Sequence, residues 1–239
     1  MLGRFLELAL VTDDTGAAWQ NWRALGFADA ATGDIWPHAY GVLTCEGLAI
    51  GLHAAGDEAL SLVFVRPEVA ALHRELQARG VKVEHARLGA DVFNQLMLRE
   101  PGGTALRVLE SRSFSPPLED PQSTALGRFA TISLPARNPD AAQEFWTRLG
   151  FQCKPSTLRE WPDQAFAVDG VPISVHPHSL LPEPALLFQQ PSRRDGSTPT
   201  ADESTLDHAG FSTGKSRPGL PPDSKLLRTA EGLAVLLFH

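Results

Sequence analysis

The sequence predicts an α+β protein made of four βαβββ modules, which are paired into two tandem domains. Two observations predict this fold class. The first is an internal repeat, because Gly3-Arg4-Phe5 returns as Gly127-Arg128-Phe129, 124 positions further along the chain. The second is the order of patterns in each half, where an alternating strand is followed by a helical stripe and then by short strands. A chain of 239 residues has room for two domains of about 110 to 120 residues.

The repeat extends over most of the chain. Further matches keep an offset of 123 to 125 positions and the same order: Trp22 with Trp146, Leu25-Gly26-Phe27 with Leu149-Gly150-Phe151, Trp36-Pro37 with Trp161-Pro162, and Leu48–His53 with Val171–His176. Collinear matches of this kind indicate a tandem duplication. The stretch Ser113–Pro121 between the copies is rich in proline and polar residues, which is typical of a linker. We therefore expect domains at 1–112 and 126–239, joined by a linker at 113–125.

The first domain opens with a strand over Phe5–Val11, because apolar residues alternate along it. A helix follows, capped by Asp14 or Thr15 and ended by Gly26. The remaining elements of this domain are expected as strands Tyr40–Cys45, Leu48–Ala54 and Leu60–Val65, a helix over Glu68–Arg79, and strands Val81–His85, Phe93–Leu98 and Ala105–Leu109.

The second domain repeats this order. It is expected to have a strand over Phe129–Pro135, a helix that Asn138 caps and Gly150 ends, and strands over Ala165–Val168 and Val171–His176. The fourth module is irregular, since Ser192–Asp207 is polar and has no helical stripe. We expect a degenerate module whose helix is shortened or replaced by a loop.

Composition narrows the function classes. Lys and Arg number 21 against 28 Asp and Glu, a net charge of −7, which disfavours a nucleic-acid partner and a polybasic membrane anchor. No apolar run approaches the roughly 18 residues that a membrane span needs. The two cysteines, Cys45 and Cys153, form no disulfide framework. A cytoplasmic protein without nucleic-acid or membrane partners is expected.

Several motifs resemble the vicinal oxygen chelate superfamily. They are the run from Leu134 to Asp140, Glu144-Phe145-Trp146 with Leu149-Gly150-Phe151, and in the first copy the segments 51–55 and 99–110. That superfamily includes glyoxalase I, extradiol dioxygenases, fosfomycin-resistance enzymes and bleomycin-binding proteins. The resemblance implies that each pair of modules curls into a glyoxalase-like half-barrel, or cup. In catalytic members His, Gln or Glu on four cup-facing strand positions holds one divalent metal.

The resemblance also implies which residues take these four positions. In the first copy they are Glu7, Gly51, Ser61 (Ala59 if the register differs) and Arg107. In the second copy they are Thr131, Ser174, Ala185 and Leu236. Only Glu7 is of a ligand type usual in the family, and Arg107 would repel a cation. We therefore expect no metal and no other cofactor at these positions, with a single divalent metal as the alternative.

Other residues are candidates for contact with a small-molecule ligand in the cups. Strand parity places His53 and His176 toward the cups, as hydrogen-bonding groups for a ligand or as histidines satisfied by a nearby carbonyl. Glu7 and Arg107 are expected close together, as a carboxylate clamp or as a buried ion pair that fills the vacated metal site. The other candidates have either a stacking or a packing role: Trp36, Trp161, Phe93 and Gln95.

The leading hypothesis from the sequence is a metal-independent small-molecule binding protein, of the bleomycin-resistance type. The alternative is a divergent metal-dependent lyase, isomerase or dioxygenase with relocated ligands drawn from His53, His176 and His208. A third hypothesis makes the second copy a scaffold that has lost its cup. Association into a homodimer remains open, because two fused domains can reproduce internally the pairing of a dimer.

Overall fold

Sixteen strands and four helices make up the part of the chain that the structure describes. The computed structural model describes residues 1–31, 36–111, 123–154, 158, 161–167, 171–190, 203–214, 217–221 and 224–238. The elements of the first half are β1 (Arg4–Val11), α1 (Thr15–Ala24), β2 (Ala28–Asp29), β3 (Tyr40–Cys45), β4 (Leu48–His53), β5 (Leu60–Arg66), α2 (Val69–Ala78), β6 (His85–Arg87), β7 (Gln95–Arg99) and β8 (Ala105–Glu110).

The second half repeats the same series of elements. They are β9 (Arg128–Ala136), α3 (Pro139–Arg148), β10 (Gln152–Lys154), β11 (Gln164–Ala167), β12 (Ile173–Pro177), β13 (Ala185–Gln189), α4 (Glu203–His208), β14 (Ser212–Thr213), β15 (Lys225–Arg228) and β16 (Ala234–Phe238). The chain therefore runs strand, helix and three strands four times, which confirms the four predicted βαβββ modules.

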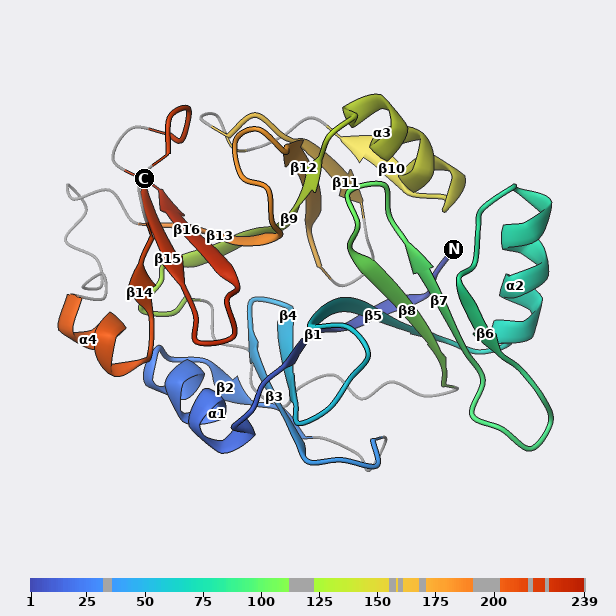
Figure 1. The fold of residues 1–239 in the computed structure, drawn as a ribbon, viewed down its shortest axis with the longest axis horizontal. Coiled ribbons are helices and arrows are strands. Elements are labelled where there is room, and N and C mark those ends of the chain that lie inside the picture. The colour runs from blue at the N-terminus through green and yellow to red at the C-terminus, as the bar shows by residue number, and fades with distance from the viewer. Residues whose placement is uncertain are drawn as a thin grey trace.

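Each half forms one eight-stranded mixed sheet (Figure 1). The strand orders are β2-β3-β4-β1-β5-β8-β7-β6 and β10-β11-β12-β9-β13-β16-β15-β14. The two orders are identical when each strand is matched with its repeat, so the predicted duplication is confirmed at the level of topology. The central pairs β4-β1 and β5-β8 are parallel, as are β12-β9 and β13-β16, and the β1-β5 and β9-β13 pairs are antiparallel.

The helices begin where the sequence predicts. The Asp14 carboxylate accepts a hydrogen bond from the Ala17 amide at 2.9 Å, and the Asn138 side chain accepts one from the Ala141 amide at 3.1 Å. Both are N-caps, which satisfy amides that have no partner in the first helical turn. Gly26 follows α1 with φ of +95°, a left-handed conformation that glycine adopts without strain.

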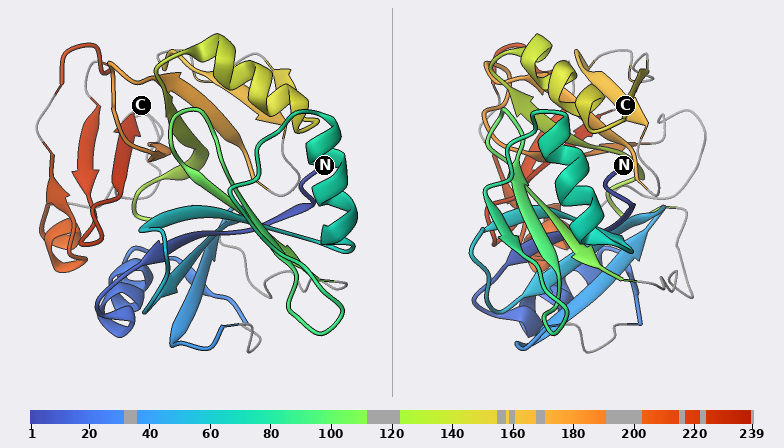
Figure 2. Two further views of the ribbon diagram at one scale, coloured as in Figure 1. Left: turned by 45° about the vertical axis from the view of Figure 1, so that its right-hand side comes forward. Right: turned by 90° about the vertical axis from the view of Figure 1, so that its right-hand side faces the viewer.

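One apolar core joins the two halves. The helix-covered faces of both sheets contribute to it, and edge-to-face aromatic contacts cross from one half to the other, such as Trp22 with Phe211 at 5.3 Å and Phe27 with Phe188 at 6.3 Å. Figures 1 and 2 show the result, with α1 beside α4 and α2 beside α3. The opposite face of each sheet is left as a separate cup, which places any ligand site away from the shared core.

Two details differ from the sequence-based expectations. The expected strand Val81–His85 is irregular up to β6. Phe93 precedes β7 and is 46% exposed, so its predicted place on the seventh strand is wrong. The fourth module keeps all five elements, and its helix α4 is shortened to six residues, which is one of the two forms expected for it. Most of the predicted linker, 112–122, lies outside the described residues.

None of the helices in the described part of the chain is long and apolar enough to cross a membrane.

Candidate functional site

The first cup brings the four predicted wall residues onto one face of the sheet. Ala9 on β1 pairs with Gly51 on β4 and with Ser61 on β5, and Val63 on β5 pairs with both Glu7 and Arg107. Directly paired residues, and residues two apart on one strand, point to the same side of a sheet. The predicted common face for Glu7, Gly51, Ser61 and Arg107 is therefore observed.

These four positions do not fit a divalent cation. A side-chain carbon at Gly51 would lie 2.4 Å from the carboxyl carbon of Glu7, so the Glu7 side chain fills the space next to it. Arg107 brings a fixed positive charge to the same face. No group of three or more His, Cys, Asp or Glu side chains that could hold a metal occurs among the described residues.

Glu7 forms a hydrogen bond with a histidine. Its carboxylate Oε1 lies 2.9 Å from Nε2 of His53, and both side chains are buried, at 3% exposure for Glu7 and 4% for His53. The other ring nitrogen of His53, Nδ1, lies 3.0 Å from Nε2 of His38. His38 is half-buried, so a linear hydrogen-bonded chain runs from a buried carboxylate through one imidazole to a second imidazole nearer the surface.

Aromatic rings enclose this chain. Tyr40 stacks on His53 with ring centroids 5.6 Å apart and planes 7° apart. Trp36 stacks on His38 at 5.7 Å and meets His53 edge-on at 5.0 Å. These contacts help to hold both imidazoles in their orientation.

Arg107 lies over the ring of Trp36, with its guanidinium carbon 4.8 Å from the ring centroid. The guanidinium makes no ion pair or hydrogen bond with any of the described residues, so the expected Glu7–Arg107 ion pair is wrong. Burial lowers the pKa of Arg107, against the opposing effect of Asp57, Glu7 and Glu58. The side chain still keeps its charge, because guanidinium does not lose its proton in proteins. It is a half-buried cation on the cup face without a carboxylate partner in the described part of the chain.

Gln95 also belongs to the first cup. It pairs with Leu109 on β8 and is half-buried. Leu109 shares the face of Arg107, two positions away, so Gln95 lies on the cup side as predicted. Its role toward a ligand stays a prediction.

The second cup is filled with apolar side chains. Its cluster consists of Trp161, Leu180, Leu181, Ala185, Leu187, Leu226, Ala234, Leu236 and Phe238. Leu236 occupies the position of Arg107, since it pairs with Leu187 as Arg107 pairs with Val63. This face of the second sheet has become a core of its own.

The polar residues of the second cup satisfy one another. Oγ of Ser133 accepts hydrogen bonds from Nε1 of Trp161 at 3.2 Å and from Oγ of Ser174 at 3.1 Å, so its own hydrogen points to Nδ1 of His176 at 2.8 Å. Nε2 of His176 then donates to the Leu181 carbonyl at 2.8 Å. Thr131 lies 3.3 Å from Ser174 at the other end of the network. Burial lowers the pKa of His176 to about 4, so the ring is neutral at neutral pH.

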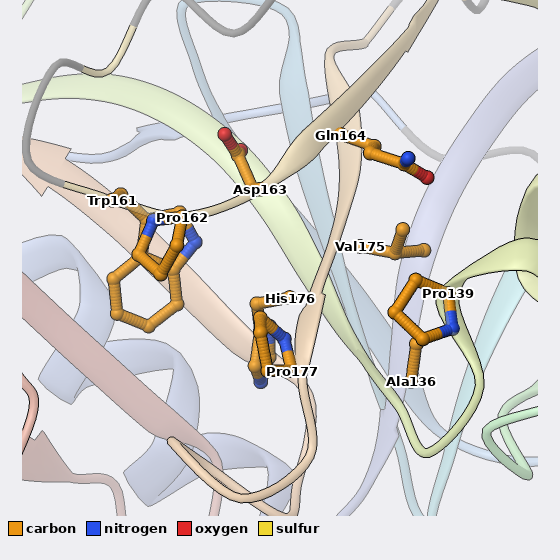
Figure 3. A pocket seen from close by; sticks show the side chains of 9 residues that line it. All are labelled: Ala136, Pro139, Trp161, Pro162, Asp163, Gln164, Val175, His176 and Pro177. Atoms are coloured by element: carbon orange, nitrogen blue, oxygen red, sulfur yellow. The ribbon is translucent and has the colours of Figure 1, made fainter.

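A surface pocket of about 350 Å³ lies beside this network (Figure 3). It is lined by Ala136, Pro139, Trp161, Pro162, Asp163, Gln164, Val175, His176 and Pro177. Trp161 and His176 are only 3% and 1% exposed, and the polar atoms of their rings are bonded within the network. These two predicted ligand residues therefore offer the pocket mainly the carbon edges of their rings.

The relocated metal ligands considered from the sequence are not brought together. Both ring nitrogens of His176 have partners inside the second cup, and His208 lies on α4, not on a strand, with Nδ1 bonded to the Ser204 carbonyl at 3.1 Å. His53 belongs to the other cup and bonds to Glu7 and His38.

Sequence reasoning missed His38 and Tyr40. The expected hairpin contained a signal for Tyr40, because strands over 40–45 and 48–53 joined at residues 46 and 47 pair Tyr40 with His53. His38 has no such signal. It stands outside any strand, and its counterpart after Trp161-Pro162 is Asp163, so neither the periodicity nor the repeat distinguishes it.

Comparison with solved structures agrees with this fold. The chain is similar to a catechol 2,3-dioxygenase, with 15% identity, a TM-score of 0.55, and coverage of 98% of this chain and 86% of the other. It is similar to the Mn(II)-bound glyoxalase from Novosphingobium aromaticivorans, with 13% identity, a TM-score of 0.54, and coverage of 98% and 81%. It is also similar to homoprotocatechuate 2,3-dioxygenase from Arthrobacter globiformis, with 11% identity, a TM-score of 0.59, and coverage of 98% and 79%.

These likenesses establish the class of fold. The chain has the paired βαβββ fold of the vicinal oxygen chelate superfamily, in its two-domain form, as the sequence resemblance implied. No family model matches the chain, and no curated protein matches it either.

Proposed function

We propose that the protein binds a small organic anion in the cup of its first domain, without a resident metal, and that the second domain is a scaffold. The observation that carries this proposal is Arg107. A half-buried guanidinium on the cup face of the sheet, with no carboxylate partner in the described residues, is a preformed partner for a carboxylate or a similar anion.

The surroundings of Arg107 favour an organic ligand over a free inorganic ion. Trp36 lies under the guanidinium, and the apolar side chains of Ala9, Val63, Val65 and Leu109 form a small cluster on the same face. Pockets for small molecules combine apolar walls with a few polar groups that set the orientation. Arg107 would hold the charged end of the ligand, and the aromatic and apolar side chains would contact its body.

The contents of the two cups support the division of roles. The first contains the Arg107 guanidinium, which makes no ion pair with the described residues, and the second contains a filled core and a polar network whose donors and acceptors are used internally. A cup filled in this way has no room for a ligand at its centre.

A metal-dependent glyoxalase-like enzyme is the second candidate. This candidate is supported by the similar solved structures, which include dioxygenases and a Mn(II)-bound glyoxalase. It requires a ligand set that the described residues do not bring together.

Titration calorimetry with benzoate tests the proposal, with benzamide as the uncharged analogue of the same shape. We expect benzoate to bind, benzamide to bind at least about tenfold more weakly, and Arg107→Ala to remove the difference. Arg74→Ala is the matched control, because Arg74 is exposed on α2, on the other side of the sheet. Equal binding of both compounds, or an unchanged affinity in Arg107→Ala, would contradict the proposal.

Elemental analysis decides between the two candidates. We expect protein purified without added metal to contain no stoichiometric transition metal, and benzoate binding to survive treatment with a chelator. A stoichiometric metal whose removal abolishes binding would instead favour the enzyme candidate.

A further inference from the structure

We propose that the first cup is also catalytic, with His38 as a general base that removes a proton from the bound molecule and with His53 and Glu7 as positioning residues. This inference goes beyond binding and rests on the proposed site around Arg107. Its substrates would be small organic molecules whose ionised form carries negative charge next to the guanidinium.

The hydrogen-bonded chain sets the tautomers of both rings. Glu7 is an acceptor only, so Nε2 of His53, 2.9 Å away, must carry hydrogen. In a neutral ring Nδ1 of His53 is then an acceptor, and the hydrogen on its 3.0 Å contact must come from Nε2 of His38. Neutral His38 therefore keeps its lone pair on Nδ1.

The lone pair on Nδ1 of His38 is the end of the chain. Nδ1 has no hydrogen-bond partner among the residues that the structure describes, and the ring is half-buried. Three neighbours face it: His53 through the hydrogen bond, Trp36 through stacking, and Arg107 through its charge. Burial lowers the pKa of His38, as do His53 and Arg107, which favours the unprotonated ring at neutral pH. A general base needs this state.

The same groups can accommodate the proton. When Nδ1 of His38 takes it up, the imidazolium donates from Nε2 to His53, and the buried Glu7 carboxylate at the far end compensates the positive charge. Arg107 stabilises the negative charge that is left on the substrate. No oxidant, reductant or metal takes part in this proton transfer.

The second cup has the opposite arrangement. Nδ1 of His176 accepts from Ser133 and Nε2 donates to the Leu181 carbonyl, so His176 has no lone pair to offer. The strand order that the two cups share therefore does not determine the activity. The activity depends on the contacts of His38.

Eliminative ring opening of 5-nitrobenzisoxazole is a direct probe of a general base next to a cation. The base takes the hydrogen on the carbon beside nitrogen, the electron pair of that C–H bond becomes the third carbon–nitrogen bond, and the nitrogen–oxygen bond breaks to release a cyanophenolate. The proton leaves His38 for water in the next step. The coloured cyanophenolate is followed by absorbance, on the full-length protein.

We expect the protein to accelerate this reaction above the buffer rate and benzoate to inhibit it competitively. His38→Gln should lower the rate by about 100-fold, the lower end of what a positioned base contributes. His38→Ala should regain part of the rate when imidazole is added, which separates loss of a base from loss of the fold. His73→Gln on α2 is the matched control and should leave the rate unchanged.

Glu7→Gln tests the positioning role. Glutamine can still accept from His53 but carries no charge, so we expect a slower reaction and a rate–pH profile whose midpoint is shifted, while circular dichroism stays the same. Glu7→Gln with the profile of the wild type would remove Glu7 from the proposal.

The outcomes separate this inference from the proposed function. If benzoate binds at Arg107 but the protein gives no rate above buffer, or His38→Gln keeps the full rate, His38 is not a base. If benzoate does not bind at all, the proposed binding site itself is wrong.

Discussion

The two cups of this protein share a strand order and a register, yet they differ in what fills them. His53 and His176 stand at equivalent positions, but the hydrogen bonds of His53 lead to a half-buried second histidine, and those of His176 end on a buried carbonyl. At the position of Arg107 the second cup has Leu236. At the position of Glu7 it has Thr131. The cation and the carboxylate of the first cup face are thus replaced by uncharged side chains in the second.

The comparison shows that the fold by itself does not define the function of either half. Both sheets are curved by the same module order and both cover the shared core with the same face. The side chains on the other face are released from that task, so they can bind a ligand or pack together.

The largest expected effect on stability comes from Leu236→Arg, which places in the second cup the charge that Arg107 carries in the first. Leu236 is fully buried among apolar side chains, and an unpaired charge there costs roughly 3–5 kcal/mol. We expect urea unfolding to show a loss of about that size, against less than about 1.5 kcal/mol for Leu236→Met. If Leu236→Arg does not lower the free energy of unfolding, the second cup is open enough to hold a ligand.

The next effect is a pH dependence that belongs to the second cup. The pKa of His176 is lowered from 6.5 to about 4 in the folded protein, so the unfolded chain binds a proton that the folded chain does not. Stability is therefore lost as the pH falls from about 6.5 to about 4, by about 3 kcal/mol in total. His176→Gln has no such proton to bind and should lose less stability over this interval, measured by urea unfolding at each pH. Parallel pH profiles for the two proteins would contradict the assignment of a neutral buried ring.

The smallest effect is expected at Phe93. The side chain is 46% exposed and precedes β7. Phe93→Ser should change the stability by no more than about 0.5 kcal/mol, as is usual for surface positions, and should leave benzoate affinity unchanged. A clear loss of affinity would return Phe93 to the site that the sequence suggested.

Much of the fold could be predicted from the sequence because local and repeated signals agree. The caps Asp14 and Asn138 mark helix starts, and the offset of 124 positions aligns two copies of each element. The resemblance to the vicinal oxygen chelate superfamily, carried over residue by residue, predicted that Glu7 and Arg107 lie on one face, and strand parity added His53 to it. Parity cannot place the end of a short strand, and β7 begins two residues after Phe93.

The partner of Glu7 illustrates what parity leaves open. Both His53 and Arg107 share its face, but His53 is on the adjacent strand β4, while β5 lies between Glu7 and Arg107. His53 pairs with Val11, four residues beyond Glu7, and the Glu7 carboxyl group reaches it across Gly51, where a side chain would collide with that carboxyl group. The space left by Gly51, which only the folded chain reveals, decides between the two. The position of the His38 side chain depends in turn on the path of the segment before β3, and no periodic pattern in the sequence specifies that path.

The continuous core has a consequence for how this protein could have diverged. Each half supplies the other with an inner wall, as the contacts of Trp22 with Phe211 and of Phe27 with Phe188 show. Loss of either half would expose that wall to water, so selection for a stable molecule retains both halves even when only one has a biochemical task. The apolar cluster on the outer face of the second sheet is made of residues of the second half alone, so substitutions there that preserve its packing leave the contacts with the first half unchanged.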